Sequence, residues 1–238
     1  METLNIPERE EECFLRLSRL INRLETPTPM ILDVGANIGQ SIEKFKHEWP
    51  DSQIHSFEPN PSTFLTLSSM WSEVTGVFPS NIALTDTIGN VPFYATRISE
   101  LASLLPPSER MQFLSSENKY DFESLNIEAD TLDNYCRKSD ISKIDLLKID
   151  VQGAELSVLK GAQSMLKNNT ISIIYVESIF ADCYDSQTNF TDLLNFLNGS
   201  LGYQLWDVQP FVYTKQDRLW ATNSIFLSPL LTSRFEDM

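Results

Sequence analysis

Positive charge, histidine, cysteine and long apolar runs are all scarce in this chain of 238 residues. Lys and Arg together number 18 against 33 acidic residues, so the formal net charge is −15. Such a surface repels phosphate backbones, which proteins bind chiefly through Lys and Arg, and it disfavours anionic membranes for the same reason. We therefore expect no nucleic acid and no membrane as partner, and a neutral or cationic small molecule suits the charge better.

The other shortages bound the class of protein. Cys13, Cys136 and Cys183 are scattered and odd in number, which predicts free thiols in a reducing compartment rather than a disulfide framework or a zinc site. No apolar run approaches the length of a membrane span, and the N-terminus lacks the basic and apolar stretches of a secretory signal. We expect a cytoplasmic protein whose 42% apolar residues fill the core of one domain.

Glycine is also rare, but two of the 8 glycines follow a short apolar run that ends at Asp33. This segment reads Ile-Leu-Asp-Val-Gly-Ala-Asn-Ile-Gly and predicts a strand, a tight turn at Gly35 and Gly39, and the start of a helix. A glycine turn lets the backbone approach a ligand because no Cβ intervenes, and the N–H groups of the helix start point at that ligand. A second expected strand, 53–57, is closed by Glu58, which is placed to accept hydrogen bonds from both hydroxyls of a ribose. Together these segments predict a site for a nucleoside-containing cofactor.

The spacing of this turn distinguishes between cofactors. A nicotinamide dinucleotide site prefers G-x-G-x-x-G, whereas the spacing here is Asp-x-Gly-x-x-x-Gly. The carboxylate of Asp33 would repel a pyrophosphate, but it suits a cofactor that carries an ammonium and a sulfonium. S-adenosylmethionine carries both and is the predicted cofactor. A glycine turn in a dinucleotide-binding fold, or an ordinary strand-to-helix loop, is the alternative.

Strand and helix patterns alternate along most of the sequence, which is typical of a parallel sheet with helices on both faces. Residues 1–29 are expected to hold an N-terminal helix, over about 8–24, that caps the core, covers the cofactor or forms a homodimer contact. Residues 30–238 are expected to form the main domain. Its alternation breaks at about 85–142, and we expect this inserted segment to face the substrate, with a solvated linker as the alternative.

Acidic residues follow three of the expected strands, at Glu58, Asp150 and Glu177. Ligands of doubly wound sheets bind beyond the carboxyl ends of the strands, so these three side chains are expected at one ligand-binding edge. Asp150 and Glu177 would be neighbours if their strands are adjacent. Lys148 lies in the buried strand before Asp150 and is expected to pair with an acid such as Glu177 or Glu155.

Six short motifs stand in order between about residues 30 and 178: Asp-Val-Gly-Ala-Asn-Ile-Gly at 33–39, Phe-Glu-Pro-Asn-Pro at 57–61, Asn-Ile-Ala-Leu-Thr-Asp at 81–86, Thr-Leu-Asp at 131–133, Leu-Leu-Lys-Ile-Asp-Val-Gln-Gly-Ala-Glu at 146–155 and Val-Leu-Lys-Gly-Ala at 158–162. This set resembles the FkbM family of S-adenosylmethionine-dependent methyltransferases. The resemblance implies the class I methyltransferase fold, an α/β fold with a seven-stranded, mostly parallel sheet, helices on both faces and an antiparallel last strand. It also implies O-methylation of a hydroxyl on a sugar or a polyketide-type natural product. The chain departs from the family at Gln152, where the family usually has Glu.

The resemblance also implies which residues bind the cofactor. They are Asp33, Gly35, Asn37 and Gly39 for the methionine part, Glu58 for the ribose hydroxyls, and Pro59, Asn81 and Ala83 around the adenine. Ser103 is assigned either to the cofactor carboxylate or to the acceptor.

The acceptor hydroxyl must lose a proton during methyl transfer, which requires a base or a Lewis acid. Asp150 is the first choice for the base and Glu177 the second. Both histidines, His47 and His55, fall in the first two strand–helix units, away from the expected acceptor side. As an alternative, Asp150 and Glu177 together hold a divalent cation such as Mg²⁺ that lowers the pKa of the acceptor hydroxyl.

The sequence does not name the acceptor beyond a small hydroxylated molecule. Four aromatic residues would line an acceptor pocket or pack in the core: Trp206, Phe211, Tyr213 and Trp220. A non-catalytic S-adenosylmethionine-binding module and a nicotinamide-dependent oxidoreductase are the alternative functions.

Overall fold

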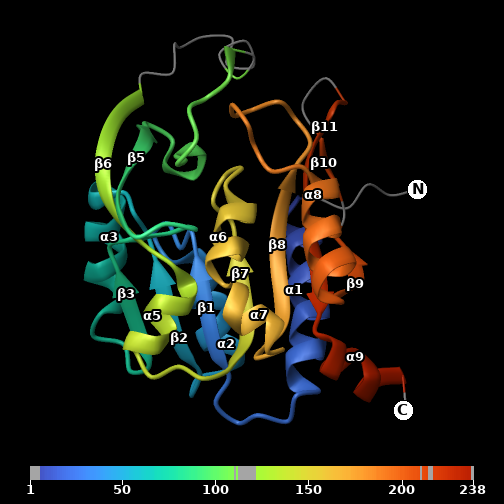
Figure 1. Cartoon of the computed structure of the whole chain (residues 1–238). Coiled ribbons are helices and arrows are strands. Elements are labelled where there is room, and N and C mark those ends of the chain that lie inside the picture. Colours follow the sequence, from blue (N-terminus) through green and yellow to red (C-terminus); the bar gives the residue numbers. More distant parts are fainter. Residues whose placement is uncertain (1–5, 110, 112–121, 210, 214–216, 237–238) are drawn as a thin grey trace.

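A computed structural model describes residues 6–109, 111, 122–209, 211–213 and 217–236, with side chains in the first helix described from Phe14 onward. An eight-stranded sheet crosses the molecule in the order β3-β2-β1-β7-β8-β11, with β10 and β9 both paired to β11 at the edge (Figure 1). The strands of this sheet are β1 (Met30–Val34), β2 (Gln53–Phe57), β3 (Val77–Ser80), β7 (Ile144–Ile149), β8 (Ile171–Ile179), β9 (Gln204–Val208), β10 (Val212–Tyr213) and β11 (Leu219–Leu227).

The pairing of these strands confirms the class I methyltransferase fold. The five strands from β3 to β8 pair in parallel, and β11 runs antiparallel to β8. The sheet has eight strands rather than the expected seven because β9 and β10 pair with opposite ends of β11. The order reverses at β1, between β2 and β7, which is where ligands of doubly wound sheets bind.

Helices cover both faces of this sheet, as the alternating pattern predicts (Figure 1). One face packs against α1 (Ile6–Asn22), α2 (Gln40–Glu48), α3 (Pro61–Trp71) and α9 (Pro229–Glu236). The other packs against α5 (Leu132–Lys138), α6 (Glu155–Gly161), α7 (Gln163–Lys167), α8 (Phe190–Leu194) and the π-helical turn η2 (Asn195–Ser200). Among the described residues, no helix is long and apolar enough to cross a membrane.

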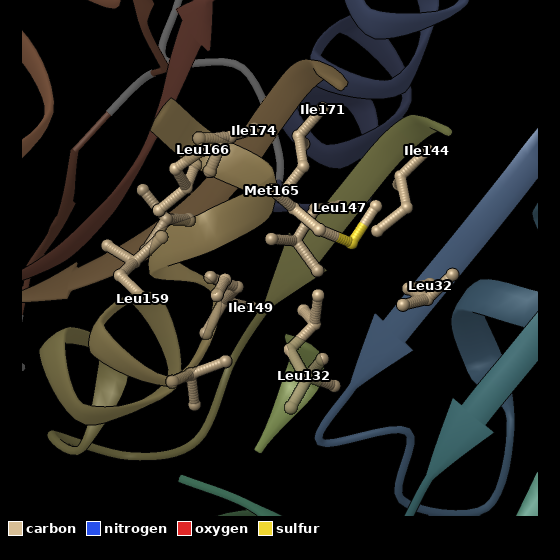
Figure 2. Packing of buried hydrophobic residues seen from close by; sticks show 14 of the residues in the cluster. Leu32, Leu132, Ile144, Leu147, Ile149, Leu159, Met165, Leu166, Ile171 and Ile174 are labelled. Atoms are coloured by element: carbon tan, nitrogen blue, oxygen red, sulfur yellow. The ribbon is translucent and has the colours of Figure 1, made fainter. Parts of the chain in front are cut away.

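The apolar strands divide the core into two layers because successive side chains point to opposite faces of the sheet. In β7, Leu146 joins the cluster under α1 and α2, whereas Leu147 joins the cluster under α5 to α7. Figure 2 shows the second layer, where Leu147 and Ile149 lie near Leu159 and Leu166 of the covering helices. Burial on both faces explains why β7 is apolar at four of its six positions. The two charged residues each have an ion-pair partner, Lys143 for Asp145 and Asp33 for Lys148.

The inserted segment forms a small sheet of its own. It contains β4 (Ala83–Leu84), β5 (Gly89–Thr96) and β6 (Phe122–Asp130), ordered β4-β6-β5, and the short helix η1 (Ser99–Leu101). Positions 110 and 112–121 of this segment lie outside the described residues.

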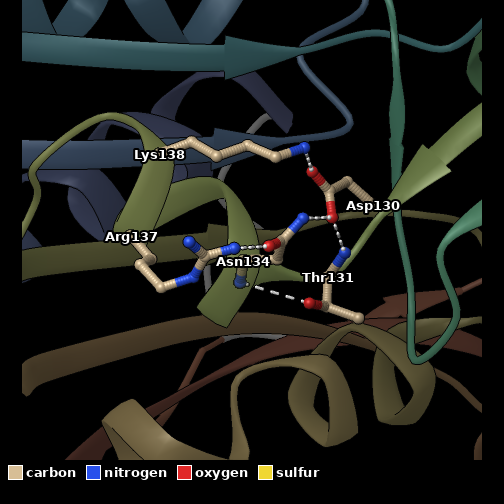
Figure 3. Close-up of polar contacts among 5 residues, drawn as sticks. All are labelled: Asp130, Thr131, Asn134, Arg137 and Lys138. Carbon is tan, nitrogen blue, oxygen red and sulfur yellow. Dashed lines mark hydrogen bonds and ion pairs between the residues drawn. The ribbon is translucent and has the colours of Figure 1, made fainter.

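The chain returns from this small sheet to the main sheet through a capped helix (Figure 3). Thr131 accepts a hydrogen bond from the backbone N–H of Asn134 at 3.2 Å, which makes it the N-cap of α5. The carboxylate of Asp130 accepts hydrogen bonds from the backbone N–H of Thr131 and, at 3.0 Å, from Lys138 Nζ at the far end of the helix. These contacts fix the direction in which the chain enters β7.

Candidate active site

Four parallel strands of the main sheet reach one edge in register. Their paired residues form one row: Phe57 of β2, Val34 of β1, Ile149 of β7 and Val176 of β8. Glu58, Gly35 and Asp150 follow their strands directly, whereas Glu177, which was expected to follow its strand, lies within β8 because that strand continues to Ile179 in its pairing with β11. All four line one cavity of about 390 Å³, a volume typical of small-molecule sites. Because β7 and β8 are neighbours, the expected proximity of Asp150 and Glu177 is confirmed.

The glycine turn after β1 passes unusually close to β7. Gly35 has φ +83°, and a Cβ at this position would lie 1.8 Å from the backbone oxygen of Asp150. Gly35 and Ala36 donate their N–H groups to the backbone oxygen of Phe57, both at 3.0 Å, which ties the turn to β2. Gly39, with φ +98°, lies against Trp71, whose ring a Cβ would meet at 2.2 Å. Only glycine fits both positions, because the backbone of Asp150 and the ring of Trp71 occupy the space that a Cβ would need.

Glu58 is held in place by backbone N–H groups on two sides. Its Oε1 accepts a hydrogen bond from Asn60 at 2.8 Å and its Oε2 accepts one from Asn37 at 3.0 Å. Asn81 donates its side-chain N–H to the backbone oxygens of Glu58 at 2.8 Å and Pro59 at 3.1 Å, so it shapes this loop from behind. Burial raises the pKa of Glu58 to about 7, although the two N–H donors oppose this change.

Lys148 forms its ion pair with a different acid from the one expected. Its Nζ lies 3.0 Å from Asp33 Oδ1 and 3.8 Å from Asp150 Oδ2, so the expected pairing with Glu177 or Glu155 is wrong. The physical reason is register, because Lys148 and Asp33 are direct neighbours across the parallel pair β7 and β1. Burial raises the pKa of Asp33, and the nearby ammonium opposes this shift.

Gln152 links the two acids proposed for catalysis. Its Nε2 donates hydrogen bonds to Asp150 Oδ1 at 3.0 Å and to Glu177 Oε2 at 2.9 Å. Its Oε1 lies 3.1 Å from the hydroxyl of Tyr184, which donates to it. Burial and the charge of Asp150 raise the pKa of Glu177 well above its usual value. The sequence pointed to Gln152 only as a departure from the family, and it gave no signal for Tyr184.

The residues assigned to the cofactor fall into two groups in the structure. Seven of the assigned site residues line the cavity: Gly35, Asn37, Glu58, Pro59, Ala83, Asp150 and Glu177. Four are not part of its lining: Asp33, Gly39, Asn81 and Ser103. The hydroxyl of Ser103, which is buried, donates to the backbone oxygen of Gln152 at 2.7 Å.

The inserted segment supplies the opposite wall of the cavity, through Phe93 of β5 and residues around η1. Asn37 donates its side-chain N–H to Ser99 Oγ at 3.1 Å, which joins the glycine turn to this wall. The aromatic residues in the lining are Phe57 and Phe93. The four aromatic residues considered for an acceptor pocket, Trp206, Phe211, Tyr213 and Trp220, are not part of the described lining.

The residues present fit S-adenosylmethionine. The turn at Gly35 lines the cavity beside Glu58, which presents a carboxylate at the tip of the neighbouring strand. A divalent cation fits less well, because the described residues contain no group of three or more His, Cys, Asp or Glu side chains that could hold one. The fold and the site thus define a class I methyltransferase.

Comparison with known proteins gives the family. The methyltransferase FkbM domain matches residues 33–205, which include every assigned site residue, and the chain belongs to this family. The 2-O-methyltransferase NoeI of Sinorhizobium fredii is 27% identical over 198 residues, which cover 79% of each chain. The hexuronic acid methyltransferase AglP of Haloferax volcanii is 26% identical over 150 residues, which cover 63% of this chain and 56% of AglP.

A solved structure supports the fold independently. The rRNA methylase of Streptococcus thermophilus aligns with 95% of this chain and 100% of its own at a TM-score of 0.50. Its sequence identity is 8%, so this likeness shows the shared fold and nothing about the substrate.

Proposed function

We propose that this protein transfers the methyl group of S-adenosylmethionine to a hydroxyl of a small sugar or natural product. The observation that carries the proposal is the meeting of Gly35, Glu58, Asp150 and Glu177 at one cavity, on four neighbouring strands. The names of two relatives support transfer to oxygen on a sugar, since NoeI is a 2-O-methyltransferase and AglP a hexuronic acid methyltransferase. The net charge of −15 favours a neutral or cationic acceptor over nucleic acid.

The chain supplies binding and orientation. Glu58 accepts the ribose hydroxyls, the turn at Gly35 and Asn37 holds the methionine part, and Phe93 and Pro59 flank the adenine. Bound S-adenosylmethionine supplies a methyl group that is already activated by its sulfonium. Alignment of the acceptor with this methyl accounts for roughly 7–11 kcal/mol of the barrier.

The acceptor proton passes to the acid pair. Asp150 is the first choice for the base because its side chain is 39% exposed and lines the cavity, where an acceptor hydroxyl can reach it. Glu177 is the second choice, because its raised pKa keeps it protonated up to a higher pH, whereas a base must be ionised. Neither assignment needs a histidine, and His55 instead contacts Tyr135 at 2.8 Å on another part of the sheet.

The test has two stages. Calorimetric titration with S-adenosylhomocysteine, with NADH as the comparison, measures cofactor binding; we expect the first compound to bind and Glu58→Ala to lose this binding. A screen of sugars and polyketides with methyl-labelled S-adenosylmethionine then measures transfer, which Asp150→Asn should abolish while S-adenosylhomocysteine still binds. Binding of NADH alone would refute the cofactor, and binding without turnover on any hydroxyl would favour a non-catalytic module.

A further inference from the structure

The side-chain amide of Gln152 occupies the space between two carboxylates. Its single nitrogen is 3.0 Å from Asp150 Oδ1 and 2.9 Å from Glu177 Oε2, and both oxygens are hydrogen-bond acceptors. A divalent cation that bridges these two acids would have to lie between the same two oxygens, because Mg²⁺ and Ca²⁺ bind carboxylate oxygens directly, at about 2.0–2.6 Å. The amide nitrogen and such a cation therefore exclude each other.

The oxygen of this amide faces Tyr184. The Tyr184 hydroxyl lies 3.1 Å from Gln152 Oε1 and 3.1 Å from the backbone oxygen of Leu101, so its one hydrogen is shared between two acceptors. A flipped amide would turn its oxygen toward the two carboxyl groups and lose both hydrogen bonds that its N–H₂ group donates to them, so the flipped arrangement is disfavoured.

The backbone of Gln152 is also held in an uncommon conformation. Its φ is +56°, in the left-handed region that side chains other than glycine rarely adopt. Ser103 donates its buried hydroxyl to the backbone oxygen of Gln152 at 2.7 Å. Such strained backbone persists where the surroundings enforce it, and it clusters at functional sites.

We propose that Gln152 is a positioning residue that takes the place of a bridging metal ion, holding Asp150 and Glu177 toward the acceptor so that methyl transfer by this chain is independent of divalent cations. Its importance for turnover rests on the proposed function, but its effect on metal binding does not. Gln152→Glu, which changes the size of the side chain very little, would convert the pair into three carboxylates around one space. This variant is expected to create a cation site that the natural chain lacks.

The experiment titrates Mn²⁺ into the full chain and measures free Mn²⁺ by electron paramagnetic resonance. We expect weak, unsaturated binding to the natural protein and at least tenfold tighter binding, with one ion per chain, to Gln152→Glu. The matched control is Gln204→Glu, which adds the same charge at an exposed position and should leave Mn²⁺ binding unchanged. Gln152→Ala, which removes the amide without adding charge, is a second variant and should tighten Mn²⁺ binding at least threefold.

S-adenosylhomocysteine binding to each variant is measured in parallel and should stay within threefold of the natural protein, which shows that the fold and the cofactor site are intact. Once an acceptor is found, Gln152→Ala should lower kcat with little change in the KM for S-adenosylmethionine, and EDTA should not affect the turnover of the natural enzyme.

The proposal is wrong if the natural protein binds one Mn²⁺ tightly and Asp150→Asn abolishes this binding, or if neither Gln152 variant gains affinity for Mn²⁺. Failure of the natural protein to bind S-adenosylhomocysteine would instead contradict the proposed function.

Discussion

At the residue scale, Glu58 connects burial to pH dependence. Its pKa is raised to about 7, so the carboxyl is largely protonated at pH 6 and largely ionised at pH 8. Only the ionised form accepts hydrogen bonds from both ribose hydroxyls, and affinity for S-adenosylhomocysteine should therefore rise about tenfold over this range. Calorimetry at several pH values checks this. Glu58→Gln should bind S-adenosylhomocysteine more weakly than the natural protein at pH 8, and its affinity should hardly change with pH. If the affinity of this variant changes with pH as much as that of the natural protein, another group is responsible for the pH dependence.

Gly35 is the residue at which a single methyl group should have the largest effect. Gly35→Ala would force a left-handed backbone on alanine and place its Cβ 1.8 Å from the backbone oxygen of Asp150. The combined strain and overpacking should destabilise the fold by about 2–4 kcal/mol and weaken S-adenosylhomocysteine binding at least tenfold. Thermal unfolding and calorimetry measure the two effects. Gly199→Ala is the control, since a Cβ there meets nothing within 4 Å, and equal losses in both variants would refute the steric argument.

The residues whose position the sequence predicted best are those that follow a strand directly. Gly35, Glu58 and Asp150 could be placed at one edge because parallel strands end together, and Glu177 reaches the same edge from within β8. The partner of Lys148 could not, since several acids lay within reach and only the register of β1 and β7 selects Asp33. The bridge made by Gln152 needed two further facts, its left-handed backbone and the approach of Tyr184 from a distant loop, that no local pattern contains.

At the element scale, the N-terminal helix packs as part of the core. Leu17, Leu20 and Ile21 of α1 are buried in the cluster that covers one face of the main sheet, on the side opposite to α6 (Figure 1). We propose that it acts as a core cap rather than as a lid or a homodimer contact. The sequence predicted the apolar face of this helix but left its partner open, because one amphipathic stripe packs equally well on a sheet, a ligand or a second chain.

A pair of leucines on α1 tests this role. Leu17 is 1% exposed and Leu15 is 49% exposed. Leu17→Ala should lower the free energy of unfolding by about 2–5 kcal/mol, whereas Leu15→Ala should change it by less than about 0.5 kcal/mol. Denaturant unfolding of both variants gives these values, and size-exclusion chromatography reports any change in assembly. A larger loss at Leu15, accompanied by dissociation, would instead make the helix a homodimer contact.

The position of the inserted segment in the fold could not be predicted from the sequence pattern alone. Extended patterns at 91–96 and 124–129 predict two of its strands, but not their pairing with each other or that the segment supplies Phe93 and the residues around η1 to the cavity wall. A wall made of a short strand and a single helical turn has no long period to recognise, and its position depends on pairing between β5 and β6 across more than 25 residues of chain. We propose that the residues around η1 face the acceptor, whereas Phe93 flanks the adenine.

At the scale of the whole molecule, the fold followed from alternation and from the six motifs. The strands β1, β2 and β7 and the antiparallel β11 agree with the class I methyltransferase sheet. The sequence did not predict that two short strands, β9 and β10, share the edge of the sheet beside β11. Each pairs with only part of β11, and short edge strands have weak sequence patterns.

The charge of the whole molecule gives a last prediction. With a net charge of −15, repulsion among surface carboxylates opposes the compact state at neutral pH. Added NaCl should screen this repulsion, so the melting temperature at pH 8 should rise by a few degrees and level off by about 0.3 M salt, where the Debye length falls to about 6 Å. At pH 4.5, close to the isoelectric point, the same addition should have little effect. Calorimetric scans at both pH values measure the difference, and a melting temperature at pH 8 that falls with salt would mean that local ion pairs such as Arg16 with Asp207 outweigh the general repulsion.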